Sequence, residues 1–239
     1  MKIDILAFAA HPDDVEISCG GTLIKSIKEE GKTVAIVDLT QGELGTRGTI
    51  ETRYAEAEAA SKILGVSHRV NLKLRDGFFL QDEASMMRII EQIRFFRPEI
   101  VLANSITDRH PDHGRASKLV SDACFYAGLR KVQTSFEGVQ QQAYRPEAVY
   151  HYIQDRHIEP DFVVDVTPYV EERMQAVMAY KTQFFDPTSS EPKTPISGKD
   201  FHDFLLARMR EFGRPIGAEY AEGFTVERYL GVNSLFDLV

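Results

Sequence analysis

The chain has few cysteines, which limits the covalent and metal chemistry that they can support. Cys19 and Cys124 are the only two among 239 residues, and no C-x-x-C pair occurs. This count excludes a disulfide-stapled scaffold and a thiolate-rich zinc site, and it is typical of proteins in a reducing compartment. We therefore expect a cytoplasmic protein.

Long apolar runs and a surplus of basic residues are also missing. No stretch approaches the roughly 18 apolar residues that span a bilayer, and the short apolar run at 3–10, interrupted by Asp4, does not make a signal peptide. The 36 acidic residues outnumber the 28 Lys and Arg, which gives a formal net charge of −8. A nucleic-acid backbone or an anionic membrane demands a basic face, so we expect neither as a partner. A few local arginines could still hold a small anionic substrate.

Short apolar runs alternate with longer amphipathic segments through the first half of the chain. The apolar runs predict strands at about 3–9, 33–39, 69–74 and 99–103. The amphipathic segments predict helices at about 20–30, 51–64, 83–96 and 114–127. Strands that alternate with helices of this length are typical of βαβ units. We therefore expect an α/β protein with a three-layer, Rossmann-like fold and a mostly parallel sheet.

The pattern is looser in the second half. Further strands are predicted at about 148–153 and 162–166, and helices at about 168–184 and 199–212, followed by a short tail. Three prolines in 186–198 predict a loop, which is our candidate for a mobile lid. No long linker divides the chain. We expect a single domain over 1–239, with a Rossmann-like core at 1–130 and additional strands, helices and the loop at 131–239.

Two His-Pro-Asp segments stand out, because each directly follows a predicted strand. The first is His11-Pro12-Asp13-Asp14, and the second lies within Asp108-Arg109-His110-Pro111-Asp112-His113. Proline disfavours helical backbone in the residue before it, so each histidine should lie extended just past its strand. Ligands of open α/β sheets bind outside the carboxyl ends of the strands. The two segments should therefore meet in the ligand crevice.

His11, Asp14 and His113 form a candidate set of three nitrogen and oxygen ligands. Three protein ligands with one position left for water are typical of catalytic zinc, whereas structural zinc prefers four ligands. We therefore expect one Zn²⁺ per subunit, although the same donor set also suits Fe²⁺ or another divalent ion.

The neighbouring polar residues suggest catalytic roles. Asp13 suits a general base for the attacking water, and His110 could act as an acid or stabilise developing charge. Asp112 could orient the His110 imidazole, and Arg53 could bind a substrate oxygen or the oxyanion. We also expect some of Arg53, Arg47 and Arg109 to form a basic lip at the mouth, because arginine can grip a carboxylate with two hydrogen bonds.

Other interpretations of the same residues stay open at this point. Asp13 and Asp14 could simply cap the following helix. A nucleotide-binding protein could use Asp38, at the end of the second strand, for a ribose. The first strand–helix turn lacks G-x-G-x-x-G, however, and no Walker A or G-x-S-x-G motif occurs. A non-catalytic metal-binding protein is the third alternative.

The motifs resemble the PIG-L/LmbE-like family of zinc-dependent N-deacetylases, which act on sugars of the N-acetylglucosamine type. The resemblance rests on A-H-P-D-D at 10–14, H-P-D-H at 110–113, T-R-Y-A-E at 52–56 and Y-A-E-G-F at 220–224. It implies an LmbE-like fold, a small N-acetylated amino-sugar as substrate, and a homo-oligomer such as a hexamer or trimer. It also implies the metal ligands and catalytic residues named above.

Within that family, the segment at 40–49 is most similar to deacetylases of bacillithiol biosynthesis. The resemblance implies N-acetyl-glucosaminyl-malate as the substrate. In one departure, Val15 stands where many relatives carry an acidic residue directly after A-H-P-D-D, which weakens any role for Glu16.

Overall fold

A computed structural model describes residues 1–238 and contains one large sheet. Its seven strands lie in the order β3-β2-β1-β4-β7-β9-β8. Their bounds are β1 Ile5–Ala9, β2 Val34–Thr40, β3 His68–Leu74, β4 Ile100–Ala103, β7 Ala148–Tyr152, β8 Phe162–Asp165 and β9 Ala221–Val226. Among these seven strands, β9 alone runs against its neighbours, β7 and β8. The short strands β5 (Ser135–Phe136) and β6 (Val139–Gln140) pair separately. The predicted mostly parallel sheet is confirmed.

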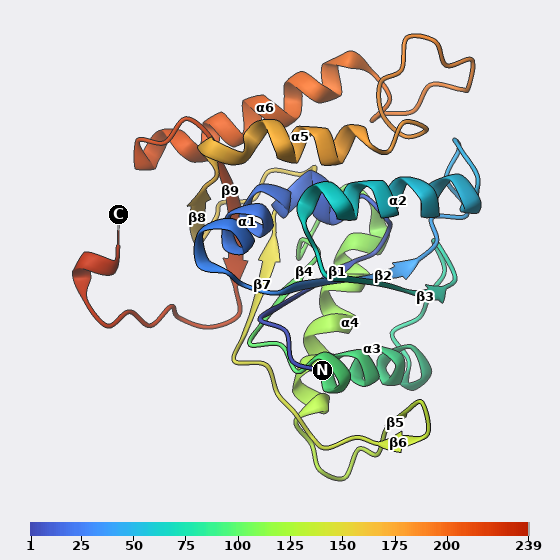
Figure 1. Cartoon of the computed structure of the whole chain (residues 1–239), viewed down its shortest axis with the longest axis vertical. Coiled ribbons are helices and arrows are strands. Elements are labelled where there is room, and N and C mark those ends of the chain that lie inside the picture. The colour runs from blue at the N-terminus through green and yellow to red at the C-terminus, as the bar shows by residue number, and fades with distance from the viewer. Residues whose placement is uncertain (239) are drawn as a thin grey trace.

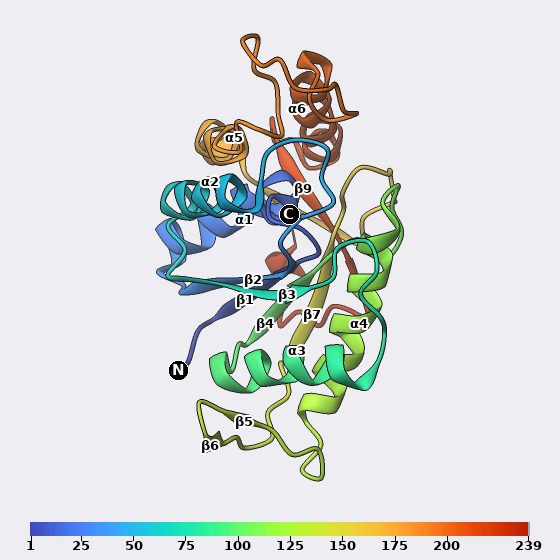
Figure 2. The ribbon, with the colours of Figure 1, turned by 90° about the vertical axis from the view of Figure 1, so that its right-hand side faces the viewer.

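Helices cover both faces of the sheet, which confirms the predicted three layers. Helices α1 and α2 lie over one face, and α3 and α4 lie over the other (Figures 1 and 2). Helices α5 and α6 lie beyond α1 and α2, and α5 contacts both of them. The bounds are α1 Asp14–Glu30, α2 Ile50–Leu64, α3 Glu83–Phe96, α4 Pro111–Ala127, α5 Val170–Met178 and α6 Lys199–Gly213, with 3₁₀ turns at Thr167–Tyr169, Arg214–Ile216 and Leu235–Asp237. Within residues 1–238, no helix is both long and apolar enough to cross a membrane.

Two helices begin earlier than predicted. We expected them to begin at Gly20 and Gly114, but α1 begins at Asp14 and α4 at Pro111. The second His-Pro-Asp segment itself opens α4, with His110 as the N-cap residue and Pro111 as the first helical residue. Helix α1 begins directly after the first segment, with Asp13 as its N-cap residue. Proline suits the first helical position, where its missing N–H has no intrahelical partner to lose. A third helix, α5, ends at Met178 instead of extending to about 184.

The expected short tail contains a strand instead. β9 lies between β7 and β8, and Glu222 on this strand reaches back to α1. Helix α1 is kinked at Cys19, which has a φ of −142°. The Glu222 carboxylate accepts hydrogen bonds from the backbone N–H groups of Gly21 (3.0 Å) and Thr22 (2.7 Å). It also lies 3.6 Å from Nε of Arg173. The Y-A-E-G-F motif thus has a structural role, holding the kinked helix against the sheet.

This buried contact predicts a large loss of stability on mutation. Glu222→Ala would leave two helix N–H groups and the Arg173 guanidinium without their carboxylate. Breaking a buried ion pair on one side costs about 3–5 kcal/mol in the free energy of unfolding. Urea unfolding, monitored by circular dichroism, measures this change in the free energy of unfolding. The matched control is Glu219→Ala, whose carboxylate makes an exposed pair with Arg210 and should cost much less. Equal losses in the two variants would contradict the role given to Glu222.

Candidate active site

The two His-Pro-Asp segments meet at the carboxyl edge of the sheet. Strands β1 and β4 are parallel neighbours, so the chain leaves both at the same edge. The His11 ring centroid lies 4.6 Å from that of His110 and 5.5 Å from that of His113. His110 has the extended backbone expected before proline (φ −84°, ψ 125°). The structure therefore brings the three imidazoles together.

The Asp14 carboxylate lies between two of these imidazoles. Its Oδ2 is 3.6 Å from Nδ1 of His11, and its Oδ1 is 3.1 Å from Nε2 of His113. Ligand atoms of His11, His110 and His113 also lie within 4.8 Å of one another. Imidazole and carboxylate donors at this separation fit a divalent cation such as Zn²⁺.

Outer carboxylates hold the same imidazoles from behind. Asp108 makes a short hydrogen bond with Nδ1 of His113, and Asp76 lies 3.1 Å from Nε2 of His11. Each imidazole thus turns one nitrogen toward Asp14 and the other toward a carboxylate, which is the usual arrangement of metal-ligating histidines. Neither Asp108 nor Asp76 was predicted from the sequence to have a role. Asp108 belongs to the second motif and could have been suspected, but no motif marks Asp76.

Two amides orient the Asp14 carboxylate. Asn104, just after β4, donates to its Oδ2 at 3.0 Å, and Gln154, just after β7, donates to its Oδ1 at 3.1 Å. Both amides are buried. Sequence reasoning missed these residues because neither lies in a motif, and only the sheet order brings them to Asp14.

The charges in this cluster favour a bound cation. Burial lowers the pKa of His113, but the Asp14 charge and the Asp108 hydrogen bond outweigh it and raise that pKa to about 9. Burial likewise opposes a proton on His11, yet Asp112, Asp14 and Asp76 raise its pKa well above the usual range. Positive charge is therefore stabilised among these groups, and the donor set is suited to a metal ion.

The Asp13 side chain does not cap helix α1. Asp13 is the N-cap residue of α1, but its side chain makes no cap hydrogen bond, and its φ of 116° is in the left-handed region. Such strain in a residue other than glycine is often found at functional sites. Burial raises the pKa of Asp13 to about 7, although the positive charge of Arg53 opposes this shift. Nη2 of Arg53 lies 3.4 Å from Oδ2 of Asp13. The capping alternative is therefore not supported for Asp13.

The expected pairing of Asp112 with His110 is different in the structure. The Asp112 carboxylate accepts hydrogen bonds from the Gly77 N–H (2.8 Å) and from Arg115 (2.6 Å), and it lies 3.4 Å from Nε2 of His11. The backbone N–H of Asp112, rather than its carboxylate, donates to Nδ1 of His110 at 3.3 Å. The carboxylate contacts His11 because Asp112 lies two positions into the helix, where its side chain faces away from the N-cap residue.

A cavity of about 280 Å³ opens over these residues. Arg53 and Arg109 line it, as expected of the basic lip, and Arg109 pairs with Asp155 at 2.8 Å. Arg47 does not line it. The Arg47 side chain is buried against 184–191, where it contacts Ser189, Glu191 and the Phe184 carbonyl. The expected place of Arg47 at the mouth is therefore corrected, because it joins two loops instead. Ile196, in the predicted loop, does line the cavity.

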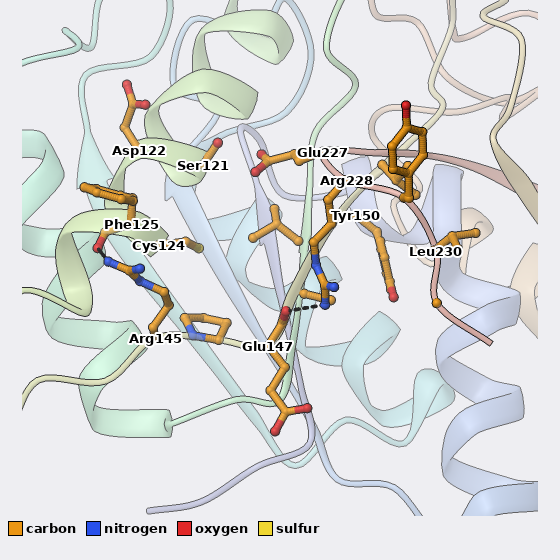
Figure 3. A pocket seen from close by; sticks show the side chains of 16 residues that line it. Ser121, Asp122, Cys124, Phe125, Arg145, Glu147, Tyr150, Glu227, Arg228 and Leu230 are labelled. Carbon is orange, nitrogen blue, oxygen red and sulfur yellow. Dashed lines mark hydrogen bonds between the residues drawn. The ribbon is translucent and has the colours of Figure 1, made fainter. Parts of the chain in front are cut away.

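A larger hollow of about 600 Å³ lies elsewhere, beside α4, β7 and the end of β9 (Figure 3). Its two arginines already have backbone partners: Arg145 donates to the Phe125 carbonyl and Arg228 to the Glu147 carbonyl, both at 2.9 Å. Two groups of possible metal donors occur in residues 1–238, His11 with His110 and His113, and His11 with Asp76 and Asp112, and neither lies there. We therefore place the candidate active site in the smaller cavity.

The structure does not support Asp38 as the ribose-binding residue of a nucleotide-binding protein. The Asp38 carboxylate is buried and accepts two hydrogen bonds from Arg69, each 2.8 Å long. Arg69 also pairs with Glu16 at 2.6 Å. Asp38 is therefore part of a buried ionic network and has no free oxygen face for a ribose.

A family model and several known proteins have sequences similar to this chain. The family model for PIG-L, described as GlcNAc-PI de-N-acetylase, matches residues 6–124. The diacetylchitobiose deacetylase of Thermococcus kodakarensis is 28% identical over 92% of this chain and 81% of its own length. The 1D-myo-inositol 2-acetamido-2-deoxy-alpha-D-glucopyranoside deacetylase of Corynebacterium jeikeium is 29% identical over 51% of this chain and 50% of its own length.

A solved structure extends the match to almost the whole chain. The conserved protein TT1542 of Thermus thermophilus is 35% identical, with a TM-score of 0.85 over 97% of this chain and 98% of its own. The N,N'-diacetylchitobiose deacetylase of Pyrococcus horikoshii has the same fold, with a TM-score of 0.78 at 23% identity over 100% of this chain and 88% of its own. The family model, the relatives and the shared fold agree: this chain belongs to the PIG-L/LmbE family of deacetylases.

Proposed function

We propose that this protein is a metal-dependent hydrolase that removes the N-acetyl group from an N-acetylglucosamine derivative. The observation that carries the proposal is the Asp14 carboxylate between His11 and His113, beside a buried Asp13 that does not cap its helix. The names of the two curated relatives both describe deacetylases of acetamido sugars. The common reaction is hydrolysis of an amide to acetate and a free amine.

In this proposal, His11, Asp14 and His113 hold one Zn²⁺, or Fe²⁺ in its place. A zinc ion in such a site acts as a Lewis acid that polarises a carbonyl and lowers the pKa of water. Asp108 and Asp76 keep the two imidazoles in the orientation that ligation needs.

The chain's own residues then move the protons. Asp13 accepts a proton from the attacking water, and Arg53 keeps the Asp13 carboxylate in place from 3.4 Å. The water oxygen bonds to the acetyl carbon, and the carbon–nitrogen bond breaks. His110, which lines the cavity, stabilises the oxyanion together with Arg53 while the proton held by Asp13 passes to the leaving amine, or it delivers its own proton to that amine and is reprotonated by the one that Asp13 took from water.

The finer proposal for the substrate is N-acetyl-glucosaminyl-malate, as in bacillithiol biosynthesis. It is supported by the resemblance of 40–49 and by the arginines Arg53 and Arg109 at the cavity. A malate group carries two carboxylates, which arginine binds with paired hydrogen bonds. The homo-oligomer implied by the resemblance stays a prediction, which sedimentation velocity can test.

Acetate release from three substrates tests the proposal. We expect the zinc-loaded protein to hydrolyse N-acetyl-glucosaminyl-malate fastest, with lower kcat/KM for N-acetylglucosamine 1-phosphate and the neutral N,N'-diacetylchitobiose. An assay with acetate kinase or by NMR measures each rate. Zinc-loaded protein that releases no acetate from any of the three would overturn the proposed function. A preference for the neutral disaccharide would overturn only the malate assignment.

A further inference from the structure

An arginine occupies the apolar face of helix α6. Phe201, Leu205 and Phe212 are buried on one side of this helix. Positions 201, 205, 208 and 212 lie on one face of the helix, so Arg208 lies on the same face as these apolar residues. An amphipathic helix normally carries apolar residues at such positions. Its exposed fraction is only 7%. A charge at such a position is costly, so it needs a reason.

Among residues 1–238, the Arg208 guanidinium makes no direct hydrogen bond or ion pair with a carboxylate. Its Nη1 is buried without a hydrogen-bond acceptor, and no carboxylate lies within ion-pair distance. Arg53 and Arg109, the other two arginines of the cavity, each have such a carboxylate. Burial and the nearby charge of Arg173 lower the pKa of Arg208 to about 10, although the more distant carboxylates of Asp155, Asp108 and Glu222 oppose this shift. The guanidinium is therefore still charged at neutral pH.

Arg208 lies at the candidate active site. Arg208 lines the same cavity as His11, Asp13 and His113. Its Cζ lies 5.1 Å from the centroid of the Phe204 ring, and such stacking holds a guanidinium plane in place. None of the ion pairs that join the imidazoles and carboxylates of the metal cluster includes Arg208. It is therefore available to a bound molecule rather than to the metal ligands.

We infer that Arg208 binds an anionic group, a carboxylate or a phosphate, carried by the part of the sugar substrate that does not react. This inference rests on the proposed function and deepens it by assigning a specificity-determining residue. A planar guanidinium binds either anion through two parallel hydrogen bonds. A bound anion would also give the buried charge a directly hydrogen-bonded counterion, which the carboxylates of Asp108, Asp155 and Glu222 do not provide from outside ion-pair distance.

The test compares Arg208→Met with the wild type on the same three substrates. We expect kcat/KM for the anionic substrate to fall by about 10- to 100-fold, the range for losing a hydrogen-bonded charge, and the value for neutral N,N'-diacetylchitobiose to stay within about twofold of the wild type. A loss confined to N-acetyl-glucosaminyl-malate identifies a carboxylate, and a loss confined to N-acetylglucosamine 1-phosphate identifies a phosphate. For Arg208→Lys, which keeps the charge without the planar guanidinium, we expect a kcat/KM on the anionic substrate between those of the wild type and Arg208→Met.

A second measurement does not depend on turnover. Calorimetric titration with the deacetylated product, glucosaminyl-malate, or with glucosamine 1-phosphate should show weaker binding to Arg208→Met by the same factor. The matched control is Arg210→Met on the same helix, whose guanidinium pairs with Glu219 and Tyr220 at the surface. This control should change neither binding nor kcat/KM.

The stability of Arg208→Met separates a binding role from a structural one. Because the substitution removes an unpaired buried charge, the variant should unfold at a temperature equal to or above that of the wild type. Equal loss on neutral and anionic substrates, unchanged product affinity, or a lowered unfolding temperature would each overturn the inference. A wild type that releases no acetate but binds the anionic products through Arg208 would instead contradict the proposed function alone.

Discussion

Replacing Asp13 by Asn should lower kcat for acetate release by about 10²–10⁴-fold, the usual cost of losing a general base. Asparagine keeps the size of the side chain and leaves the Arg53 guanidinium beside it, but it cannot accept a proton from water. The ligand atoms of His11, Asp14 and His113 are unchanged by the substitution. Bound zinc, measured by atomic emission, should therefore stay at the wild-type level while the rate falls.

The control for this substitution is Asp122→Asn, which makes the same chemical change on α4. The Asp122 carboxylate pairs only with the exposed Lys118, so we expect wild-type rates. Near-full activity of zinc-loaded Asp13→Asn would show that another group takes the proton. Loss of zinc together with activity would show that Asp13 acts through the metal site instead.

Removal of the metal is expected to abolish acetate release, and added Zn²⁺ should restore it. The reason lies in the donor set, where two imidazoles turn toward the Asp14 carboxylate with outer carboxylates behind them. Treatment with a chelator, dialysis and titration with Zn²⁺ or Fe²⁺ measure the dependence. Full activity of metal-free protein would contradict the hydrolase mechanism. Tight metal binding with no acetate from any substrate would favour a binding protein.

The substitution Asp108→Asn should weaken metal binding without removing a proposed metal ligand. The substitution weakens the carboxylate that holds Nδ1 of His113, and losing such an outer partner typically costs about 10- to 100-fold in metal affinity or activity. Competition with a fluorescent zinc chelator measures the affinity. Unchanged affinity and unchanged rate would show that Asp108 does not support the ligand His113.

The local patterns of the sequence predicted the first half of the fold well, because each element there carries its own signal. Strand β9 was missed for a physical reason. Its residue Glu222 points into the protein, and Gly223 follows it, so the strand lacks the apolar character of the others. The burial of that carboxylate depends on the N–H groups of Gly21 and Thr22, which lie about 200 positions away. No local pattern contains that information.

The candidate site likewise contains residues that local motifs predict and residues that only long-range contacts bring there. His11, Asp14 and His113 lie in two compact motifs, and parallel strands at one edge bring the motifs together. Asp76 and Arg208 reach the site from a loop and from a distant helix, so only the three-dimensional structure identifies them. The Asp112 carboxylate contacts His11 instead of His110, because closeness in sequence to His110 does not decide where a side chain points at the start of a helix.

The contact between Glu222 and α1 also has a consequence for biosynthesis. The ribosome makes the three proposed metal ligands, the last of them His113, more than a hundred residues before it makes Glu222. During that interval the backbone N–H groups of Gly21 and Thr22, beside the kink of α1, lack the carboxylate that accepts from them in the folded protein. Domains tend to fold from the N-terminal side during translation, but here the last strand supplies the contact that fixes the first helix. We therefore expect nascent chains that end before β9 to bind zinc weakly, and the full affinity to arise only once β9 has been made.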